Sequence, residues 1–379
     1  MVKLAPYATH WKNSKGRFFA EPEASERTPF QRDRDRIIHA DAFRKMQYKT
    51  QVYANQDSSD HYRTRLTHSM EVAQVCRSIC RALNLDEDLG ECVALAHDLG
   101  HTPFGHAGED ALNACMAPYG GYRHNDQTLK IVRSLECRYP NFDGLNLTWE
   151  ALEGIAKHNG PCKEGYDEAL YGDLEPTTFS GLEAQVAALA DDIAYNHHDI
   201  DDSLHMGSLS LRTICQFEPF ARTFSEVESS FPKASERRLI KETLRRMLDR
   251  AVKDLIKTSK QRLKNSGVKT VEDVRNYHEP LIAFSEPMAA LMKDMKAFMF
   301  EHVYRHYQMN RAAFRAYRVI EGLFETYMKH RRMLSSEHQL NLPEDKEDIH
   351  GKAQVVANYI AGLTDRSAVQ EHARLFGIR

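Results

Sequence analysis

Apolar side chains recur every three or four residues along most of the chain, which is the pattern of amphipathic helices. Between residues 32 and 52 the positions expected in the core are Ile37, Ile38, Phe43, Met46 and Val52. A following helix has Thr67 as its expected N-cap, and its apolar side consists of Met70, Ala73, Cys76, Cys80 and Leu83. No segment has a convincing period-two alternation, so the pattern predicts an all-α protein.

Further helices are predicted downstream. Asp86 begins one, lined by Leu89, Val93 and Ala96, which Gly100 and Pro103 end. Loops rich in glycine and proline surround a short helix near 149–157, and a longer helix covers 181–204. The segment 235–330 is charged and helical, with one apolar stripe made of Ile240, Leu244, Leu248, Ala251 and Leu255.

The chain has 379 residues, enough for one large domain or two ordinary ones. We predict a single all-α domain made of an N-terminal arm (1–31), a core (about 32–205) and a C-terminal helical extension (206–379). The formal net charge of -3 argues against a globally basic nucleic-acid coat protein. The 7 cysteines lack CxxC spacing, which favours free thiols in a reducing compartment. No run approaches the roughly 18 apolar residues that span a bilayer, so we expect a cytoplasmic protein that does not associate with a membrane.

The densest group of titratable side chains follows the helix that Asp86 begins. His97 and Asp98 are adjacent, and an imidazole with a carboxylate suits a divalent cation of borderline hardness. His101, His106 and Glu109 follow within a few turns and can titrate near neutral pH beside such a cation. We interpret this stretch as part of a metal centre. Because two ligands hold a catalytic metal poorly, other segments are expected to contribute.

Two other helices carry candidate ligands. His68 lies in the first turn of its helix, where a capping histidine is the alternative interpretation. Asp191, Tyr195 and Asp199 are spaced i, i+4 and i+8 and therefore share one helical face. Buried helices rarely carry so many ionisable groups unless these are paired or bind a metal, whereas a solvated acidic face is the alternative.

The order of these groups resembles a known family. His68, His97–Asp98 and a distal aspartate match the H…HD…D pattern of the HD superfamily of metal-dependent phosphohydrolases. The flanking segments resemble deoxynucleoside triphosphate triphosphohydrolases, above all the bacterial dGTPase-like branch; these segments are Lys49–Tyr53, Arg65–Ser69, His97–Glu109 and Ala190–Tyr195. The resemblance covers about residues 26–205, and Ile360–Arg366 also looks familial.

This resemblance implies an HD-superfamily helical core with additional C-terminal helices, and hydrolysis of a dNTP, such as dGTP, to deoxynucleoside and intact triphosphate. It implies one divalent ion (Mg²⁺, Mn²⁺ or another transition metal) held by His68, His97, Asp98 and Asp191. Asp191 is chosen over Asp192 because the family's ligand lies four residues before a substrate-contacting tyrosine, here Tyr195. The remaining expected site residues are His106, Glu109 and His124 for catalysis, and Gln51, Arg65, His101, Tyr195 and Asp199 for substrate binding.

The chemistry of such a site can be written from its groups. A divalent cation polarises the α-phosphate and can orient or deprotonate water. We expect His106, oriented by Glu109, to protonate the departing 5′-oxygen, with a general-base role as the alternative. A ribose 2′-OH needs space beside the sugar, so Gln51 and Tyr195 are the expected deoxyribose gatekeepers.

Other functions stay open at this point. One is a different HD-family nucleotide phosphohydrolase, such as a nucleotidase or cyclic-nucleotide phosphodiesterase, and another is a non-catalytic sensor that binds nucleotides or single strands. Residues 237–264 carry eleven Lys or Arg and three Asp or Glu, a candidate surface for single-stranded nucleic acid or an effector nucleotide. A solvated helix face with i,i+4 pairs is the alternative. By analogy with related enzymes we expect a homo-oligomer, a tetramer or hexamer, with an activating nucleotide at an interface.

Overall fold

The computed structural model describes residues 3–22, 26–51, 63–162, 165–345 and 347–377. These residues form α-helices joined by 3-10 turns, π turns and loops, and they contain no strand, which confirms the all-α prediction. Extended pairing within this part of the chain is limited to isolated bridges, such as the one between Thr50 and Thr64. Val52, which was expected in the core, and Tyr53 of the familial segment lie outside the described residues.

The contacts divide the chain into two compact units. The first comprises 1–34, 68–95 and 148–307, and the second comprises 35–67, 96–147 and 308–379. The expected metal ligands are therefore divided as well: His68 and Asp191 belong to the first unit, and His97 and Asp98 to the second. The expectation of one domain with an arm, a core and an extension stays a prediction.

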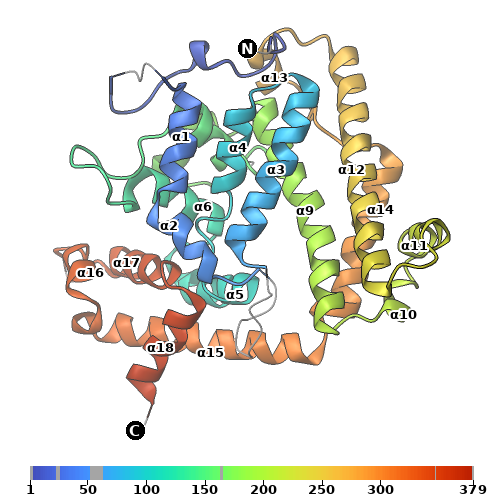
Figure 1. Cartoon of the computed structure of the whole chain (residues 1–379). Helices are drawn as coiled ribbons and strands as arrows, with labels where there is room; N and C mark the ends of the chain where they lie inside the picture. The colour runs from blue at the N-terminus through green and yellow to red at the C-terminus, as the bar shows by residue number, and fades with distance from the viewer. Residues whose placement is uncertain (1–2, 23–25, 52–62, 163–164, 346, 378–379) are drawn as a thin grey trace. The chain divides into compact units, whose positions relative to one another are not determined.

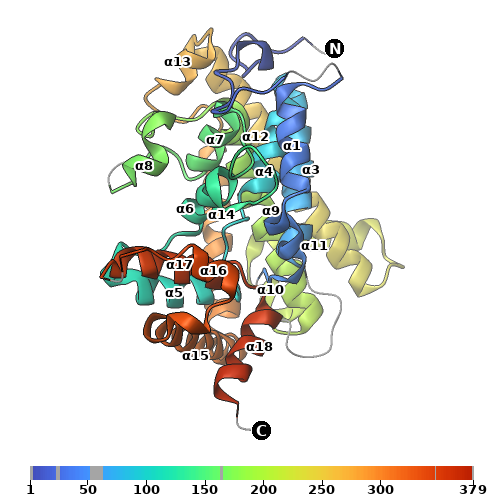
Figure 2. The ribbon, with the colours of Figure 1, turned by 90° about the vertical axis from the view of Figure 1, so that its left-hand side faces the viewer.

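The first unit is built around the long helix α9 (Leu182–Met206), which α7, α12 and α14 contact. Figures 1 and 2 show α12 and α14 running alongside α9. Besides α9, the helices that lie wholly or mostly in this unit, with the three just named included, are α1 (Pro29–Ile38), α3 (Arg65–Leu83), α4 (Glu87–Ala96), α7 (Trp149–Ala156), α8 (Glu168–Tyr171), α10 (Leu211–Ile214), α11 (Glu218–Ser230), α12 (Glu236–Ser266), α13 (Val271–Arg275) and α14 (Glu286–Met299).

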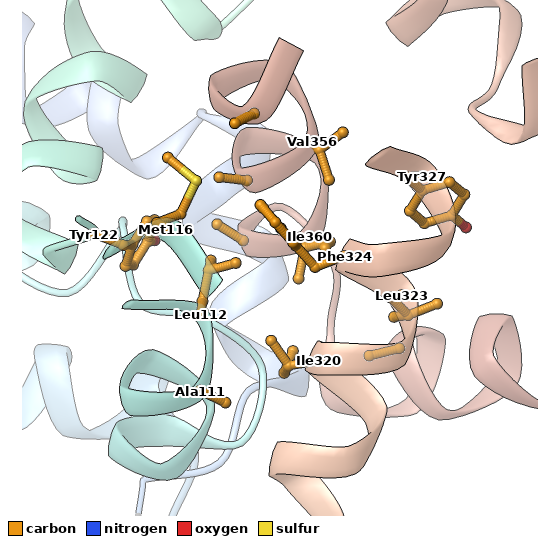
Figure 3. Packing of buried hydrophobic residues seen from close by; sticks show 14 of the residues in the cluster. Ala111, Leu112, Met116, Tyr122, Ile320, Leu323, Phe324, Tyr327, Val356 and Ile360 are labelled. Carbon is orange, nitrogen blue, oxygen red and sulfur yellow. The ribbon is translucent and has the colours of Figure 1, made fainter. Parts of the chain in front are cut away.

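The second unit has its apolar core where α5, α15 and α17 meet (Figure 3). Leu112 and Met116 of α5 pack with Ile320 and Phe324 of α15 and with Ile360 of α17, all buried. This packing anchors α5, the helix whose first turn carries His106. The helices of this unit are α2 (Asp41–Lys45), α5 (Gly105–Met116), α6 (His124–Lys130), α15 (Tyr307–Lys329), α16 (Ser336–Leu340), α17 (Ile349–Ala361) and α18 (Asp365–Phe376).

Several predicted elements form with nearly the predicted bounds. The helices expected near 149–157 and over 181–204 are α7 and α9. Asp86 caps α4 as expected, because its Oδ1 accepts hydrogen bonds from the backbone N–H groups of Asp88 and Leu89, each at 3.0 Å. Asp, Ser, Thr and Asn are preferred at this position because their side chains satisfy backbone donors that the first turn leaves unpaired.

Other local expectations were wrong. The helix predicted from residue 32 is interrupted, because Ala40 has extended backbone angles and α2 starts anew at Asp41. Ile38, expected in the core, is 39% exposed, and Met70, on the expected apolar side of its helix, is 56% exposed. Thr67 is not the N-cap of α3, which begins at Arg65; Thr64 and Thr67 instead each accept the other's backbone N–H.

Candidate active site

The HD dyad lies in a turn of the second unit, directly after α4 ends at Ala96. His97 Nε2 is 3.3 Å from Asp98 Oδ1, and both side chains are almost completely buried. The other oxygen, Asp98 Oδ2, accepts a hydrogen bond of 2.8 Å from Arg65 Nη1. Burying a carboxylate is costly without such a charge-assisted partner. Arg65, expected to contact phosphate, is thus bound directly to the dyad.

Three imidazoles gather beside Asp98 within the same unit. His101 Nε2 is 3.3 Å from Asp98 Oδ1. The ring of His124 stacks on that of His101 with centroids 3.9 Å apart, and the ring of His106 meets it edge-on at 5.3 Å. One ligand atom from each of Asp98, His101 and His124 lies within 4.8 Å of the others. The structure therefore brings together the groups that the sequence places between residues 98 and 124.

Glu109 joins two of these imidazoles. His124 contributes both its backbone N–H, 2.8 Å from Glu109 Oε1, and its Nδ1, 2.9 Å from the same oxygen. His106 Nδ1 lies 3.6 Å from Glu109 Oε2. Burial alone would raise the pKa of Glu109, but hydrogen bonds from His106 and His124 together hold that pKa far below its usual range. Glu109 is therefore a carboxylate at neutral pH and can accept hydrogen bonds from both imidazoles.

The surroundings of His101 favour its uncharged form, whereas those of Glu109 favour the charged form. Burial is the main cause that lowers its pKa well below the usual value, and the neighbouring Arg65 guanidinium and His124 lower it further. At neutral pH this imidazole is uncharged. It can therefore donate from one ring nitrogen and accept at the other, whereas His106, with a side chain 63% exposed, faces solvent.

Gly100 allows this group to assemble. A Cβ at this position would lie 2.2 Å from the carbonyl oxygen of His124 and 2.3 Å from the backbone nitrogen of Thr128. Without that atom, α6 approaches the turn closely enough for Thr128 Oγ1 to accept the Gly100 N–H at 2.9 Å. Tyr122 completes the contact by donating its hydroxyl to the Gly100 carbonyl at 2.6 Å. The close approach is what brings the ring of His124 onto His101.

Gly100→Ala is therefore expected to push α6 away from the turn. Forcing an added methyl into a packed interior typically costs about 1–3 kcal/mol, and here both obstructing atoms are backbone. We expect a lower free energy of unfolding by urea denaturation, together with lost activity. Gly207→Ala is the control: it has a positive φ of 72° but no atom near its Cβ. Gly100 has no positive φ, so an effect of Gly207→Ala as large as that of Gly100→Ala would contradict the prediction that the close approach at Gly100 costs more than backbone strain alone.

The first unit holds the other two expected ligands. His68 Nε2 is 2.8 Å from Asp191 Oδ1, and His68 is buried whereas the Asp191 side chain is 26% exposed. His158 Nε2 lies 3.6 Å from Asp191 Oδ2. The ring of His68 also meets that of His198 edge-on, with centroids 5.8 Å apart. His68 is thus paired with the carboxylate that the family resemblance selects, and not with Asp192, which binds Lys296 Nζ at 2.8 Å.

Further along the same face of α9, Asp199 is fully buried and accepts a hydrogen bond from the Tyr304 hydroxyl. Burial raises the pKa of Asp199 to about 7, against the lowering effect of that hydrogen bond. Tyr195, half-buried, lies between Asp191 and Asp199 on this face. The hydroxyls of Tyr304 and Tyr195 are both hydrogen-bond partners of the buried Asp199 carboxyl, so Asp199 does not belong to the solvated acidic face that the sequence left open.

Comparison with known proteins places the chain in a family. A family model for the HD domain matches residues 65–196, and one for a phosphohydrolase-associated domain matches residues 282–374. A deoxyguanosinetriphosphate triphosphohydrolase-like protein of Ralstonia nicotianae is 49% identical over 99% of this chain and 95% of its own length. Like-named proteins of Thiobacillus denitrificans (48%; 99% and 98%) and Parvibaculum lavamentivorans (46%; 99% and 96%) are similar throughout.

This chain belongs to the dGTPase-like family of HD-domain phosphohydrolases. The resemblance found in the sequence is thereby confirmed, and the protein is a hydrolase of the HD family. No helix in the described part of the chain is long and apolar enough to cross a membrane.

HD phosphohydrolases use a metal, and the residues present in this chain fit one. Each unit by itself holds an imidazole next to a carboxylate, His68 with Asp191 in the first and His97 with Asp98 in the second. Nitrogen and oxygen donors of this kind suit Mn²⁺ and other first-row divalent ions, and carboxylates suit Mg²⁺. Behind the second pair, Arg65 holds Asp98 in place, which is the kind of outer partner that orients a ligand.

Several residues that form polar contacts with the candidate site residues were not identified from the sequence. His158 follows α7 as a single histidine in a glycine- and proline-rich loop, Tyr304 is one of many aromatic residues, and Lys49 was singled out only as part of a familial segment. No local signal marks the first two. Their pairings with Asp191 and Asp199 span long separations in the chain, so only the folded structure reveals them.

The basic segment 237–264 belongs to α12. Many of its cations form ion pairs: Lys241 with Asp201, Arg245 and Arg246 with Glu242, and Lys253 with Asp249. These pairs fit the alternative of a solvated helix face, and nucleic-acid binding here stays a prediction.

Proposed function

We propose that this protein hydrolyses deoxynucleoside triphosphates to the deoxynucleoside and intact triphosphate in a metal-dependent reaction. The observation that carries the proposal is the carboxylate of Glu109 held between His124 and His106, close to the HD dyad. Relatives at 49% identity along nearly the whole chain are named deoxyguanosinetriphosphate triphosphohydrolase-like proteins.

The proposed metal ligands are His68, His97, Asp98 and Asp191. When bound, one divalent ion of the Mg²⁺ or Mn²⁺ type would polarise the α-phosphate and promote attack by water. The support for this set is the family's H…HD…D order together with the imidazole–carboxylate pair in each unit.

His106 and His124 are the proposed proton-handling groups, with Glu109 as the carboxylate that orients them. Expelling the 5′-oxygen of the nucleoside requires a proton at that oxygen, which a protonated imidazole can supply. Glu109 lies closer to His124 (2.9 Å) than to His106 (3.6 Å), and its carboxylate is placed to orient either imidazole. His106 is the more exposed of the two and is our choice for contact with the leaving group.

Substrate contacts are assigned by the charge and burial of the remaining groups. Arg65 supplies positive charge beside Asp98, and the neutral His101 offers a ring N–H for a phosphate oxygen. Gln51 is buried, and its Oε1 accepts no hydrogen bond within the described residues, so this oxygen can accept one from a sugar hydroxyl. Tyr195 and Asp199 are the proposed sugar contacts of α9. A homo-oligomer and an activating nucleotide at its interface remain expectations from the family resemblance.

Incubation of the purified protein with dGTP or dATP and Mg²⁺, Mn²⁺ or Co²⁺ is expected to release deoxynucleoside and intact triphosphate. GTP is expected to react far more slowly, because a buried sugar site that leaves the 2′-OH unpaired loses affinity. Anion-exchange chromatography of the products separates triphosphate from pyrophosphate and phosphate. All four dNTPs should be supplied singly and mixed, since a second nucleotide can act as an activator.

The alternatives give different results in the same assay. Pyrophosphate with a nucleoside monophosphate, or phosphate from a monophosphate substrate, would identify another HD phosphohydrolase. Nucleotide or single-strand binding in the presence of chelator, with no product under any metal, would identify a non-catalytic sensor. Equal rates on GTP and dGTP with every metal would contradict the proposed sugar site.

A further inference from the structure

The carboxylate of Asp365 joins two loops that are distant from it in the chain. Asp365 is the first residue of α18 and is 7% exposed. Its Oδ1 accepts the backbone N–H of Phe104 at 2.9 Å. Its Oδ2 accepts the backbone N–H of Thr50 at 3.1 Å and also the Thr50 hydroxyl. All these residues belong to the second unit.

Each of these loops leads into a residue of the proposed site. Thr50 directly precedes Gln51, and Phe104 lies two residues before His106. The loops also touch: a Cβ at Gly105 would be 3.3 Å from the Gln51 carbonyl oxygen. Because Asp365 binds the backbones of both loops, it fixes the separation between Gln51 and His106.

The turn that carries His106 needs such support. Phe104 has φ 65° and Gly105 has φ 61°, so two consecutive residues adopt the left-handed conformation. For a bulky side chain this conformation is strained, and it persists only when the surroundings hold it. Asp365 accepts the N–H of the strained Phe104, and Thr102 donates its hydroxyl to the Gly105 carbonyl at 3.2 Å.

A second tie connects the same segments. The buried Lys49 donates from Nζ to the carbonyl of His101 at 2.6 Å and to that of Ala361, the last residue of α17, at 2.8 Å. The Lys49 carbonyl accepts the Arg65 N–H at 3.1 Å. The segment around Lys49 and Thr50 is thus bound to the end of α17, to the start of α18 and to the HD turn.

Asp365 is not needed as the cap of its own helix. Aspartate near a helix start is favourable because of the helix dipole, which gives a purely structural explanation for the residue. However, Thr364 already caps α18, with its side chain bonded to the N–H of Ser367 and its own N–H bonded to Ser367. Both oxygens of Asp365 instead bind partners 261 and 315 residues away in sequence.

We propose that Asp365 is a positioning residue that holds the Gln51 loop and the His106 turn at a fixed separation, so that the C-terminal segment governs the geometry of dNTP hydrolysis. This inference rests on the proposed function for its kinetic consequence. Its structural content, that one carboxylate restrains both loops, can be tested without activity.

The test compares Asp365→Asn, Thr50→Val and the double variant with Glu371→Gln as the matched control. Asparagine can still accept the Phe104 N–H, but its amide nitrogen cannot accept from Thr50. Glu371 is a carboxylate on the same helix, bonded to the Tyr327 hydroxyl at 2.9 Å and to Arg374, and it contacts neither loop. Thr50→Ser retains the hydroxyl and serves as the conservative variant.

Hydrogen exchange of peptides covering 49–51 and 102–106 is the first measurement. Segment 49–51, which loses its acceptor, is expected to exchange at least about tenfold faster in Asp365→Asn, and both segments are expected to do so in Asp365→Ala, which removes both acceptor oxygens; neither should change in Glu371→Gln. Unchanged exchange in Asp365→Asn would overturn the proposal whether or not the protein hydrolyses dNTPs. An inactive wild type with the expected exchange pattern would refute the proposed function while leaving the restraint established.

Kinetics are the second measurement. Asp365→Asn is expected to lower kcat/KM for dNTP by about 10–100-fold, because small misplacements of reacting groups carry losses of this size. The dNTP-to-rNTP ratio of kcat/KM should fall, metal content should be unchanged, and Thr50→Ser should keep wild-type activity. Thr50→Val should add little in the Asp365→Asn background, since Asp365→Asn already removes the acceptor of the Thr50 hydroxyl. A lower melting temperature with wild-type kcat/KM and an unchanged ratio would contradict a positioning role.

Discussion

Asp191→Ala is expected to abolish both metal binding and dNTP hydrolysis. Removing a group that only orients a metal ligand costs about 10–100-fold, so loss of a ligand should lower kcat/KM by more than about 100-fold. Asp191 is paired with His68 at 2.8 Å and is partly exposed, so its removal should leave the fold intact. Metal content by mass spectrometry after dialysis, measured together with activity, checks this expectation.

Asp192→Asn is the matched control for that experiment. Asp192 is the neighbouring carboxylate of α9, with a side chain 43% exposed and bound to Lys296. Because exposed ion pairs contribute little to stability, we expect near wild-type metal content and activity. If Asp192→Asn loses the metal and Asp191→Ala keeps it, the ligand assignment must be exchanged. If neither substitution changes metal content, α9 holds no metal ligand at either position.

His106→Ala is expected to lower kcat by about 10²–10⁴-fold while the protein still binds metal and dNTP. That range is typical for loss of a general acid or base. The side chain of His106 is 63% exposed, so its removal creates no core cavity and should change the free energy of unfolding by less than about 0.5 kcal/mol. Single-turnover kinetics with saturating metal, together with equilibrium dNTP binding, measure the two parts separately.

Two further variants make the His106 result specific. His278→Ala, at a histidine whose side chain is 75% exposed, should leave kcat unchanged. His124→Ala removes the imidazole bonded most closely to Glu109 and should also reduce kcat. Wild-type kcat in His106→Ala would remove His106 from the mechanism. A large loss confined to His124→Ala would assign the proton transfer to His124.

Much of the fold could be predicted from the sequence because helix formation is a local matter. The apolar spacing in α9 and the Asp86 carboxylate at the start of α4 each involve residues that are close together in the chain. The predicted helix and the predicted helix start were both confirmed. Ile38 and Met70 fit the same spacing but are exposed. Periodicity shows that a side chain is apolar; whether another element covers it depends on packing from elsewhere in the chain.

The candidate site, like the fold, was predicted from the sequence in part and was decided by the tertiary structure in part. Residue types and spacing were sufficient to select the HD dyad, His106 and Glu109, because these groups lie within a short stretch and carry the chemistry themselves. Which groups they pair with was decided only by tertiary structure. Buried polar atoms need partners, but a sequence does not say which of many distant candidates will supply them. Tyr304 binds Asp199 from 105 residues away, and Asp365 binds Thr50 from 315 residues away, since only the folded chain brings those atoms together.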